Sequence, residues 1–222
     1  MMRKSTGNMY DFVDYTFNII KGRCPHNCNY CFMKKFPQGE LRFVEKELKT
    51  NLGKDNFIFV GSSCDMFAKD IPEEWILKVL EHCSKFDNKY LFQSKNPGRI
   101  FDLSKYLPKQ VVLGTTIESN RTYGCMGNTP SPSGRAKMLS DLKKKNYETM
   151  ITIEPILDFS IPDFVDLIKI ANPTWVNIGA DSKNHNLPEP SREKVIQFIE
   201  ELSKITEIKK KSNLGRILNT SE

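Results

Sequence analysis

The chain has 222 residues with 33 Lys+Arg, 27 Asp+Glu and 39% hydrophobic positions, the composition of an ordinary globular protein. Its net charge of +6 permits an anionic partner without requiring one. No run reaches the ~18 apolar residues of a membrane span, and no apolar secretory core follows Met1. We therefore expect a cytoplasmic chain with no membrane partner.

Apolar runs alternate with helical periods along the chain. Strands are predicted at residues 15–20, 57–60, 89–92, 111–117, 149–153 and 174–178. Helices are predicted at residues 40–49, 73 to about 83, 98–106 and 162–171. Another is predicted to follow the Gly- and Pro-rich loop at 119–133 and to end at about 145, and the last begins after the cap Ser191.

Six strands that each precede a helix predict an α/β fold, with a parallel sheet and its helices outside. Both a partial (β/α)6 barrel and a doubly wound sheet fit, and both bind ligands at the carboxyl ends of their strands. We expect an N-terminal segment at residues 1–14, the barrel domain at 15–205, and a basic, loosely held C-terminal tail at 206–222.

Three of the six cysteines, Cys24, Cys28 and Cys31, lie within eight residues directly after the first predicted strand. Thiolates at this spacing select zinc or an iron–sulfur cluster. A structural zinc site usually takes four protein ligands, and the fourth would have to be His26 or a distant cysteine. Three ligands to a four-iron cluster instead leave one iron open to bind something else.

The spacing CxxxCxxC, with Tyr30 before the third cysteine, at the end of the first strand of an alternating chain, resembles the radical S-adenosylmethionine (radical SAM) superfamily. The resemblance covers residues 15–202 and implies a partial parallel barrel that holds a [4Fe-4S] cluster and SAM. It also implies that an electron from the reduced cluster cleaves SAM to a 5′-deoxyadenosyl radical, which abstracts hydrogen from a substrate. An external electron donor such as flavodoxin or ferredoxin is expected.

The resemblance assigns the cluster to Cys24, Cys28 and Cys31 and places Tyr30 near the adenine of SAM. Backbone contacts to SAM are expected from the turn after the second strand, residues 61–63. The family often has a Gly-Gly-Glu-like segment there, and this chain has no acid at the third position of that segment. Charged or hydroxyl contacts are expected at later strand ends, with ordinary surface side chains as the alternative. These cofactor-binding candidates are Gly61, Ser62, Ser63, Lys95, Thr116, Glu118, Arg135 and Glu154, with Arg121 and Asp181 as weaker ones.

Cys64 is a candidate catalytic residue. The stretch Gly61-Ser62-Ser63-Cys64-Asp65 resembles the one after the second strand of spore photoproduct lyase, a radical SAM enzyme in which a cysteine there donates a hydrogen atom. The alternative for Cys64 is a small buried core residue. Cys83 lies on an apolar helix face and is expected to be buried, and Cys125 has no assigned role.

The substrate is left open. Short motifs around Cys64, Lys95 and Glu154 also resemble uncharacterised radical SAM proteins that phages often encode, which associates the chain with nucleic-acid or nucleotide repair or modification. Lysine runs at residues 34–35, 143–145 and 209–211 are compatible with phosphate contacts or with solvated helix ends. The alternatives are a non-catalytic zinc or iron–sulfur module that binds nucleic acid, and an activase of a protein partner.

Overall fold

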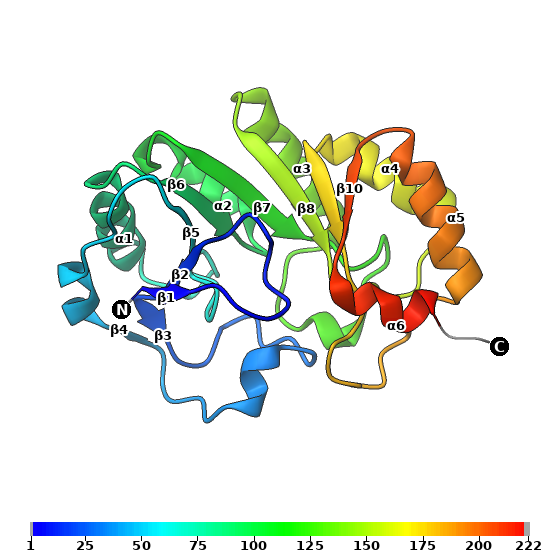
Figure 1. Cartoon of the computed structure of the whole chain (residues 1–222), viewed down its shortest axis with the longest axis horizontal. Helices are drawn as coiled ribbons and strands as arrows, with labels where there is room; N and C mark the ends of the chain where they lie inside the picture. The colour runs from blue at the N-terminus through cyan, green and yellow to red at the C-terminus, as the bar shows by residue number, and fades with distance from the viewer. Residues whose placement is uncertain (1, 220–222) are drawn as a thin grey trace.

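The computed structural model describes residues 2–219. Its main sheet has eight strands in the order β1-β2-β5-β6-β7-β8-β9-β10. The strands are β1 (Arg3–Lys4), β2 (Tyr15–Phe17), β5 (Phe57–Val60), β6 (Lys89–Gln93), β7 (Val111–Thr116), β8 (Glu148–Ile153), β9 (Trp175–Ile178) and β10 (Glu207–Lys210). All neighbours pair in parallel except β1, which runs antiparallel to β2. The sheet is curved and not closed, so the α/β partial barrel is confirmed (Figure 1).

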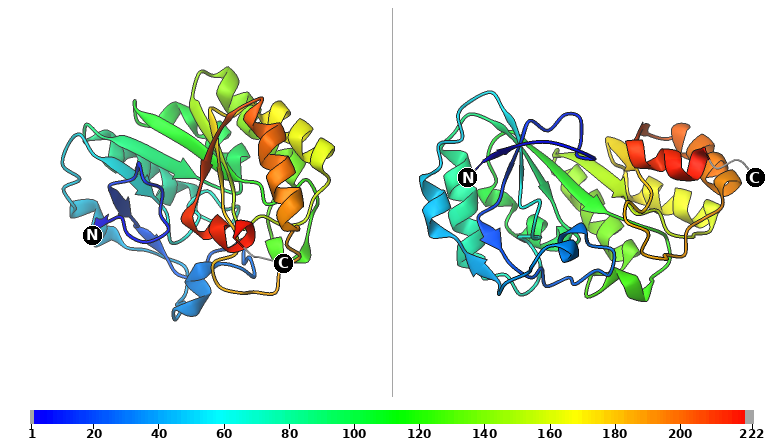
Figure 2. Two further views of the ribbon diagram at one scale, coloured as in Figure 1. Left: turned by 45° about the vertical axis from the view of Figure 1, so that its right-hand side comes forward. Right: turned by 60° about the horizontal axis from the view of Figure 1, so that its bottom comes forward.

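The helices cover the outer face of the sheet (Figure 1, Figure 2). They are α1 (Glu73–Ser84), α2 (Pro97–Asp102), α3 (Pro132–Lys144), α4 (Ile161–Ala171) and α5 (Arg192–Ser203). The short α6 (Gly215–Leu218) follows β10 and lies beside α5 at the lower edge in Figure 1. Ser191 caps α5 as expected, because its hydroxyl accepts a hydrogen bond from the Lys194 amide. Outward side chains of the strands and inward faces of these helices form the larger core.

The inner face of the sheet is filled by the N-terminal segment. Residues 5–14 cross this face, as the dark blue trace in Figure 1 shows. Tyr10 and Val13 pack there in a second apolar cluster with Phe59, Leu91, Val112, Met150 and Trp175. The carboxyl ends of the strands stay open beyond this plug, which leaves that edge for a site.

Two predicted elements differ from the structure near the first strand. The predicted strand at 15–20 divides into β2 and β3 (Ile20–Lys21). The prediction of a helix at 40–49 is wrong. Residues there form β4 (Arg42–Phe43), antiparallel to β3, and a 3-10 helix at Glu45–Lys49. Leu41 and Phe43 pack on the core as alternate residues of an extended segment, a pattern that charged neighbours concealed.

The C-terminal segment is not loosely held over residues 207–218. β10 adds a seventh parallel strand beside β9, and Leu214 and Ile217 are buried beyond it. The lysines concealed this strand in the sequence, although the ammonium group of Lys209 packs 4.6 Å from the centroid of the Trp175 ring. The domain boundaries at residues 14 and 205 stay predictions. No helix within residues 2–219 is long and apolar enough to cross a bilayer.

Candidate active site

The three clustered cysteines line one cavity of about 680 Å³ at the carboxyl edge of the sheet. We call it the cysteine cavity; its walls also contain Tyr30, Gly61, Ser62, Ser63, Cys64, Lys95, Thr116, Glu154 and Asp181. The structure thus brings together most of the residues that the sequence singled out. Glu118, Arg135 and Arg121 do not line it.

The loop that follows β7 holds the cysteine loop in place. The amide of Asn29 donates to the Cys125 carbonyl at 2.8 Å, and the amide of Asn128 donates to the His26 carbonyl at 2.7 Å. Gly127 has φ +68°, and a Cβ atom on it would lie 2.1 Å from the His26 carbonyl oxygen. The backbone around Cys125 therefore supports the cysteine loop, a role that the sequence did not indicate.

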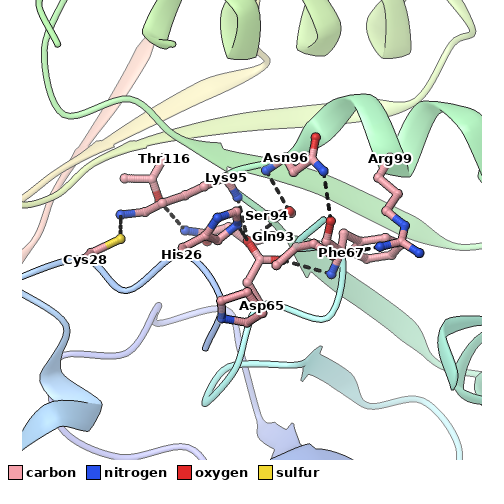
Figure 3. Close-up of polar contacts among 12 residues, drawn as sticks. His26, Cys28, Asp65, Phe67, Gln93, Ser94, Lys95, Asn96, Arg99 and Thr116 are labelled. Atoms are coloured by element: carbon pink, nitrogen blue, oxygen red, sulfur yellow. Dashed lines mark hydrogen bonds and ion pairs between the residues drawn. The ribbon is translucent and has the colours of Figure 1, made fainter. Parts of the chain in front are cut away.

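His26 and Asp65 form a buried ion pair behind this loop (Figure 3). The imidazole donates from Nε2 to Asp65 Oδ2 at 2.9 Å and from Nδ1 to the Asn128 carbonyl at 3.2 Å. Burial opposes the charged imidazole, but Asp65 outweighs it and raises the pKa of His26. Both ring nitrogens are engaged, so His26 is not a free fourth metal ligand.

Asp65 also accepts hydrogen bonds from the Ser94 hydroxyl at 2.9 Å and the Lys95 amide at 2.8 Å. Burial would raise the pKa of Asp65, but these donors and His26 lower it overall. The carboxylate therefore ties the end of β6 to the cysteine loop (Figure 3). Sequence reasoning missed this link because its partners are 39 and 30 positions apart.

A second buried network joins four charged or polar side chains. Glu118 accepts from Lys95 Nζ at 2.8 Å through one oxygen and from Arg135 at 2.8 Å through the other. Tyr30 donates its hydroxyl to Glu118 as well. Burial would raise the pKa of Glu118, but the two cations hold it well below its usual range. Lys95 and Tyr30 line the cavity, whereas Glu118 and Arg135 do not. Glu118, paired with Arg135, therefore fixes the positions of Lys95 and Tyr30 from outside the cavity wall.

Lys95 connects this network to the cysteines. Its ammonium group lies 3.3 Å from Cys28 Sγ, 2.6 Å from the Tyr30 hydroxyl and 4.4 Å from the centre of the Tyr30 ring. Burial alone would lower the pKa of Lys95. The charges of Glu118 and Cys28 outweigh burial and raise the pKa overall, so the side chain stays charged. A cation is therefore held beside a thiol that is a candidate metal ligand.

Cys64 is buried near Cys24. The interaction between the two thiols lowers the pKa of Cys24 to about 6 despite the burial of that residue, and it raises the pKa of Cys64. Cys83 is fully buried in the outer core, as expected, and burial raises its pKa. Cys64 and Cys83 therefore differ, because Cys64 lines the cysteine cavity and Cys83 does not.

The turn after β5 presents its backbone to the cavity. Gly61 adopts φ +82°, a conformation that favours glycine. The amide of Ser63 donates to the Asn18 side chain at 2.9 Å, and the Ser62 hydroxyl accepts from the Asn18 amide group at 3.1 Å. Asn18, which the sequence analysis did not select, thus shapes this turn.

The acids that follow β8 and β9 have separate partners. Glu154 accepts from Asn8 at 2.7 Å and Asn213 at 2.6 Å, and pairs with Lys211 at 2.7 Å. Asp181 accepts from the His185 ring at 2.7 Å. Burial would raise the pKa of Asp181, but the His185 and Lys183 donors lower it.

Arg121 does not reach the cavity. It pairs with Asp158 at 2.6 Å beside α4 and α5. Tyr10 and Thr152 were missed: the Tyr10 hydroxyl bonds Gln93 at 2.7 Å and Thr152 at 2.6 Å, and Gln93 donates to the predicted residue Thr116 at 3.1 Å. All four residues line the cysteine cavity, and no local sequence signal marks Tyr10 or Thr152.

The donor set distinguishes a single metal ion from an iron–sulfur cluster. Within residues 2–219, no three His, Cys, Asp or Glu side chains converge on a point suited to one metal ion. Cys24, Cys28 and Cys31 are free thiols that line a shared cavity. Three thiols of this kind are the donors that a [4Fe-4S] cluster takes, so the residues present fit that group.

Comparison with known proteins bears on this site. No family model matches the chain. A segment of 82 residues is 30% identical to L-lysine 2,3-aminomutase of Escherichia coli and covers 34% of this chain and 24% of that protein. A variant of spore photoproduct lyase with bound AdoMet (SAM) and dinucleoside spore photoproduct superposes with a TM-score of 0.60 at 12% identity, covering 90% of this chain and 64% of that one.

The chain resembles radical SAM enzymes in sequence and in fold. A second spore photoproduct lyase structure, complexed with the dinucleoside photoproduct, agrees with a TM-score of 0.59 and covers 92% of this chain. At 12% identity these two structures establish the radical SAM fold and no more. The chain spans 24% of the aminomutase and less than two thirds of either lyase chain.

Proposed function

We propose that the chain is a radical SAM enzyme that holds a [4Fe-4S] cluster through Cys24, Cys28 and Cys31 and binds SAM in the cysteine cavity. The observation that carries the proposal is the shared cavity, in which the three thiols meet strand-end residues from β5, β6, β7 and β8. When bound and reduced, the cluster would supply the electron for cleavage of SAM to methionine and a 5′-deoxyadenosyl radical, which would serve for hydrogen abstraction from the substrate.

The chain's own residues then bind and orient SAM. Lys95 offers a charge for the SAM carboxylate, and Glu118 and Arg135 position that lysine from behind. Tyr30 lies beside Lys95 and is proposed to pack on the adenine. The turn from Gly61 to Ser63 provides backbone groups for SAM. Thr116 at the end of β7 provides a hydroxyl group, and Glu154 directly after β8 provides a carboxylate.

Cys64 is proposed as the hydrogen-atom donor that quenches a substrate radical. It lines the same cavity as the three cluster cysteines, and its thiol keeps its proton because its pKa is raised. Replacing Cys64 with Ala is expected to leave SAM cleavage intact and to change the product. An unchanged product distribution would remove Cys64 from the mechanism.

A nucleic acid or nucleotide is the proposed substrate, in a repair or modification reaction. Support comes from the fold shared with spore photoproduct lyase, whose structures contain a dinucleoside photoproduct. We also propose an external electron donor such as flavodoxin or ferredoxin, and a cytoplasmic location, because free thiols of this kind require a reducing compartment.

Anaerobic purification and reconstitution test the proposal. The expected result is a brown protein with about four irons per chain that forms 5′-deoxyadenosine from SAM after reduction. Cys28→Ala is expected to lose the iron, whereas the matched variant Cys83→Ala, in the outer core, is expected to keep it. A colourless protein with one zinc ion would favour the non-catalytic module. Product formation that requires a protein from cell extract, and not DNA or RNA, would favour the activase.

A further inference from the structure

A short aromatic segment lies at the mouth of the cysteine cavity. The 3-10 helix Phe32–Lys35 follows Cys31 directly, and Phe32, Lys35 and Phe36 all line the cavity. The Phe32 side chain is 48% exposed and that of Phe36 is 47% exposed, although both are large and apolar. The other exposed large apolar residues of the described chain, such as Tyr106 and Ile170, lie outside the cavity wall. Two such rings at one cavity mouth indicate a binding surface.

Lysines accompany these rings. Lys35 Nζ lies 4.9 Å from the centre of the Phe36 ring, a distance typical of a cation–π contact. Lys183, in the loop after β9, lines the cavity from another part of the chain. Figures 1 and 2 show that this loop and the 3-10 helix project from the same edge of the molecule. Neither lysine has an acidic partner among residues 2–219, in contrast to Lys95 and Lys211.

This combination fits one class of ligand. An aromatic face stacks on any nucleobase, and an unpaired ammonium group attracts a phosphate. A purely apolar partner would gain nothing from the two lysines. We propose that Phe32 and Phe36, with Lys35 and Lys183, form a stacking platform for a single-stranded nucleic acid, from which an unpaired base enters the cysteine cavity.

The inference rests on the proposed function, since it names the substrate that the cysteine cavity takes. It adds that the base must be unstacked from its strand before it enters. A duplex whose bases are all paired offers no free base face to Phe32 or Phe36. The platform is therefore expected to prefer a single strand over the same sequence in a duplex.

Binding can be measured without chemistry, on the full chain with its cluster and without reductant. The probe is a fluorescein-labelled oligodeoxythymidylate of about twelve nucleotides, compared with its duplex and with oligouridylate, by fluorescence anisotropy. Each of Phe32→Leu and Phe36→Leu is expected to weaken single-strand binding by about 5- to 100-fold, because one base stack is lost. Tyr106→Leu is the matched control, since Tyr106 is 44% exposed and also lies under a lysine, and no change is expected.

Salt dependence tests the lysines separately. Lys35→Gln and Lys183→Gln are each expected to reduce the slope of log affinity against log salt by ~0.7. Lys105→Gln, beside Tyr106, is the control and should keep the wild-type slope. Circular dichroism and the thermal midpoint show whether each variant is folded, and Phe32→Met replaces Phe32→Leu if that variant unfolds.

The outcomes separate the inference from the proposed function. If Phe32→Leu and Phe36→Leu bind the single strand as Tyr106→Leu does, or if the wild type binds the duplex more tightly, the platform is refuted. Tighter binding of oligouridylate supports the platform and assigns RNA. The proposed function fails on a different result, which is that the reconstituted wild type does not cleave SAM.

Discussion

Lys95 Nζ lies 3.3 Å from Cys28 Sγ, so a buried cation is held against one of the three clustered thiols. The contact exists because Glu118 accepts a hydrogen bond from the same ammonium group at 2.8 Å. Removing Glu118 would leave Lys95 and Arg135 buried without their shared counter-charge. The carboxylate is therefore the central element of this part of the site.

Replacing Glu118 with Gln is expected to lower the free energy of unfolding by about 3–5 kcal/mol, the usual cost of breaking a buried ion pair. Urea unfolding of the cluster-free chain measures it. The control is Glu148→Gln, which removes a half-exposed pair with Lys89 and should cost under about 1 kcal/mol. Equal losses in the two variants would contradict the buried network.

The pair of His26 and Asp65 predicts a pH dependence. The raised pKa of His26 stabilises the fold below the unfolded value of about 6.5, and this contribution is lost as pH rises through the folded pKa. The lowered pKa of Asp65 stabilises the fold above about 3.9 and is lost as pH falls. In cluster-free protein, the stability difference between wild type and His26→Gln is expected to shrink from pH 6 to pH 9.

His82 provides a control of opposite sign. Burial lowers its pKa, so its contribution is present at high pH and is lost as pH falls. The difference between wild type and His82→Gln should therefore grow over the same range. Parallel curves for the two variants would show that Asp65 does not hold a charged His26.

Gly127 predicts a local effect on the cysteine loop. In Gly127→Ala the Cβ atom would meet the His26 carbonyl, and the residue would keep an unfavourable φ, so the loop must move. We expect a loss of roughly 1–3 kcal/mol in stability and reduced iron content after reconstitution. Gly124→Ala is the control, because no atom lies within 4 Å of its Cβ position. Equal iron content in both variants would contradict this role.

The interaction of Cys64 with Cys24 predicts a change in thiol reactivity. In cluster-free Cys64→Ala, the pKa of Cys24 is expected to rise above its value of about 6, because this interaction is lost. The measurement is the pH dependence of alkylation at the Cys24 peptide, followed by mass spectrometry. Cys83→Ala should leave the profile unchanged. An unshifted profile in Cys64→Ala would contradict this interaction.

Much of the fold was predictable from the sequence because buried parallel strands are runs rich in apolar and β-branched residues. Residues 57–60, 111–116 and 149–153 are such runs, and the structure confirms each as a strand. β10 was missed because its mixed charges resemble a solvated tail. The pairing of β10 with β9 and the partial burial of Ile208 are set by distant residues, which a local pattern does not contain.

The candidate site was predictable where a local motif carries chemistry, as with the three cysteines. Polar partners were not predictable, because their meaning lies in tertiary contacts. Tyr10 meets Thr152 across 142 positions, and Asn8 meets Glu154 across 146. Nothing in the residues around Tyr10 or Asn8 indicates such partners.

The contacts of Glu154 bear on when the cavity forms during synthesis and folding of the chain. Asn8 and Lys211 reach this carboxylate from opposite ends of the described chain, and Ser212 donates to Asn8 across 204 positions. Contacts of such separation form late and slowly in folding. A nascent chain that already contains every cysteine thus still lacks one wall of the cavity. Iron and sulfide delivered before then would meet an exposed thiol loop, so productive loading is expected to follow the synthesis and folding of the segment that contains Lys211 and Ser212.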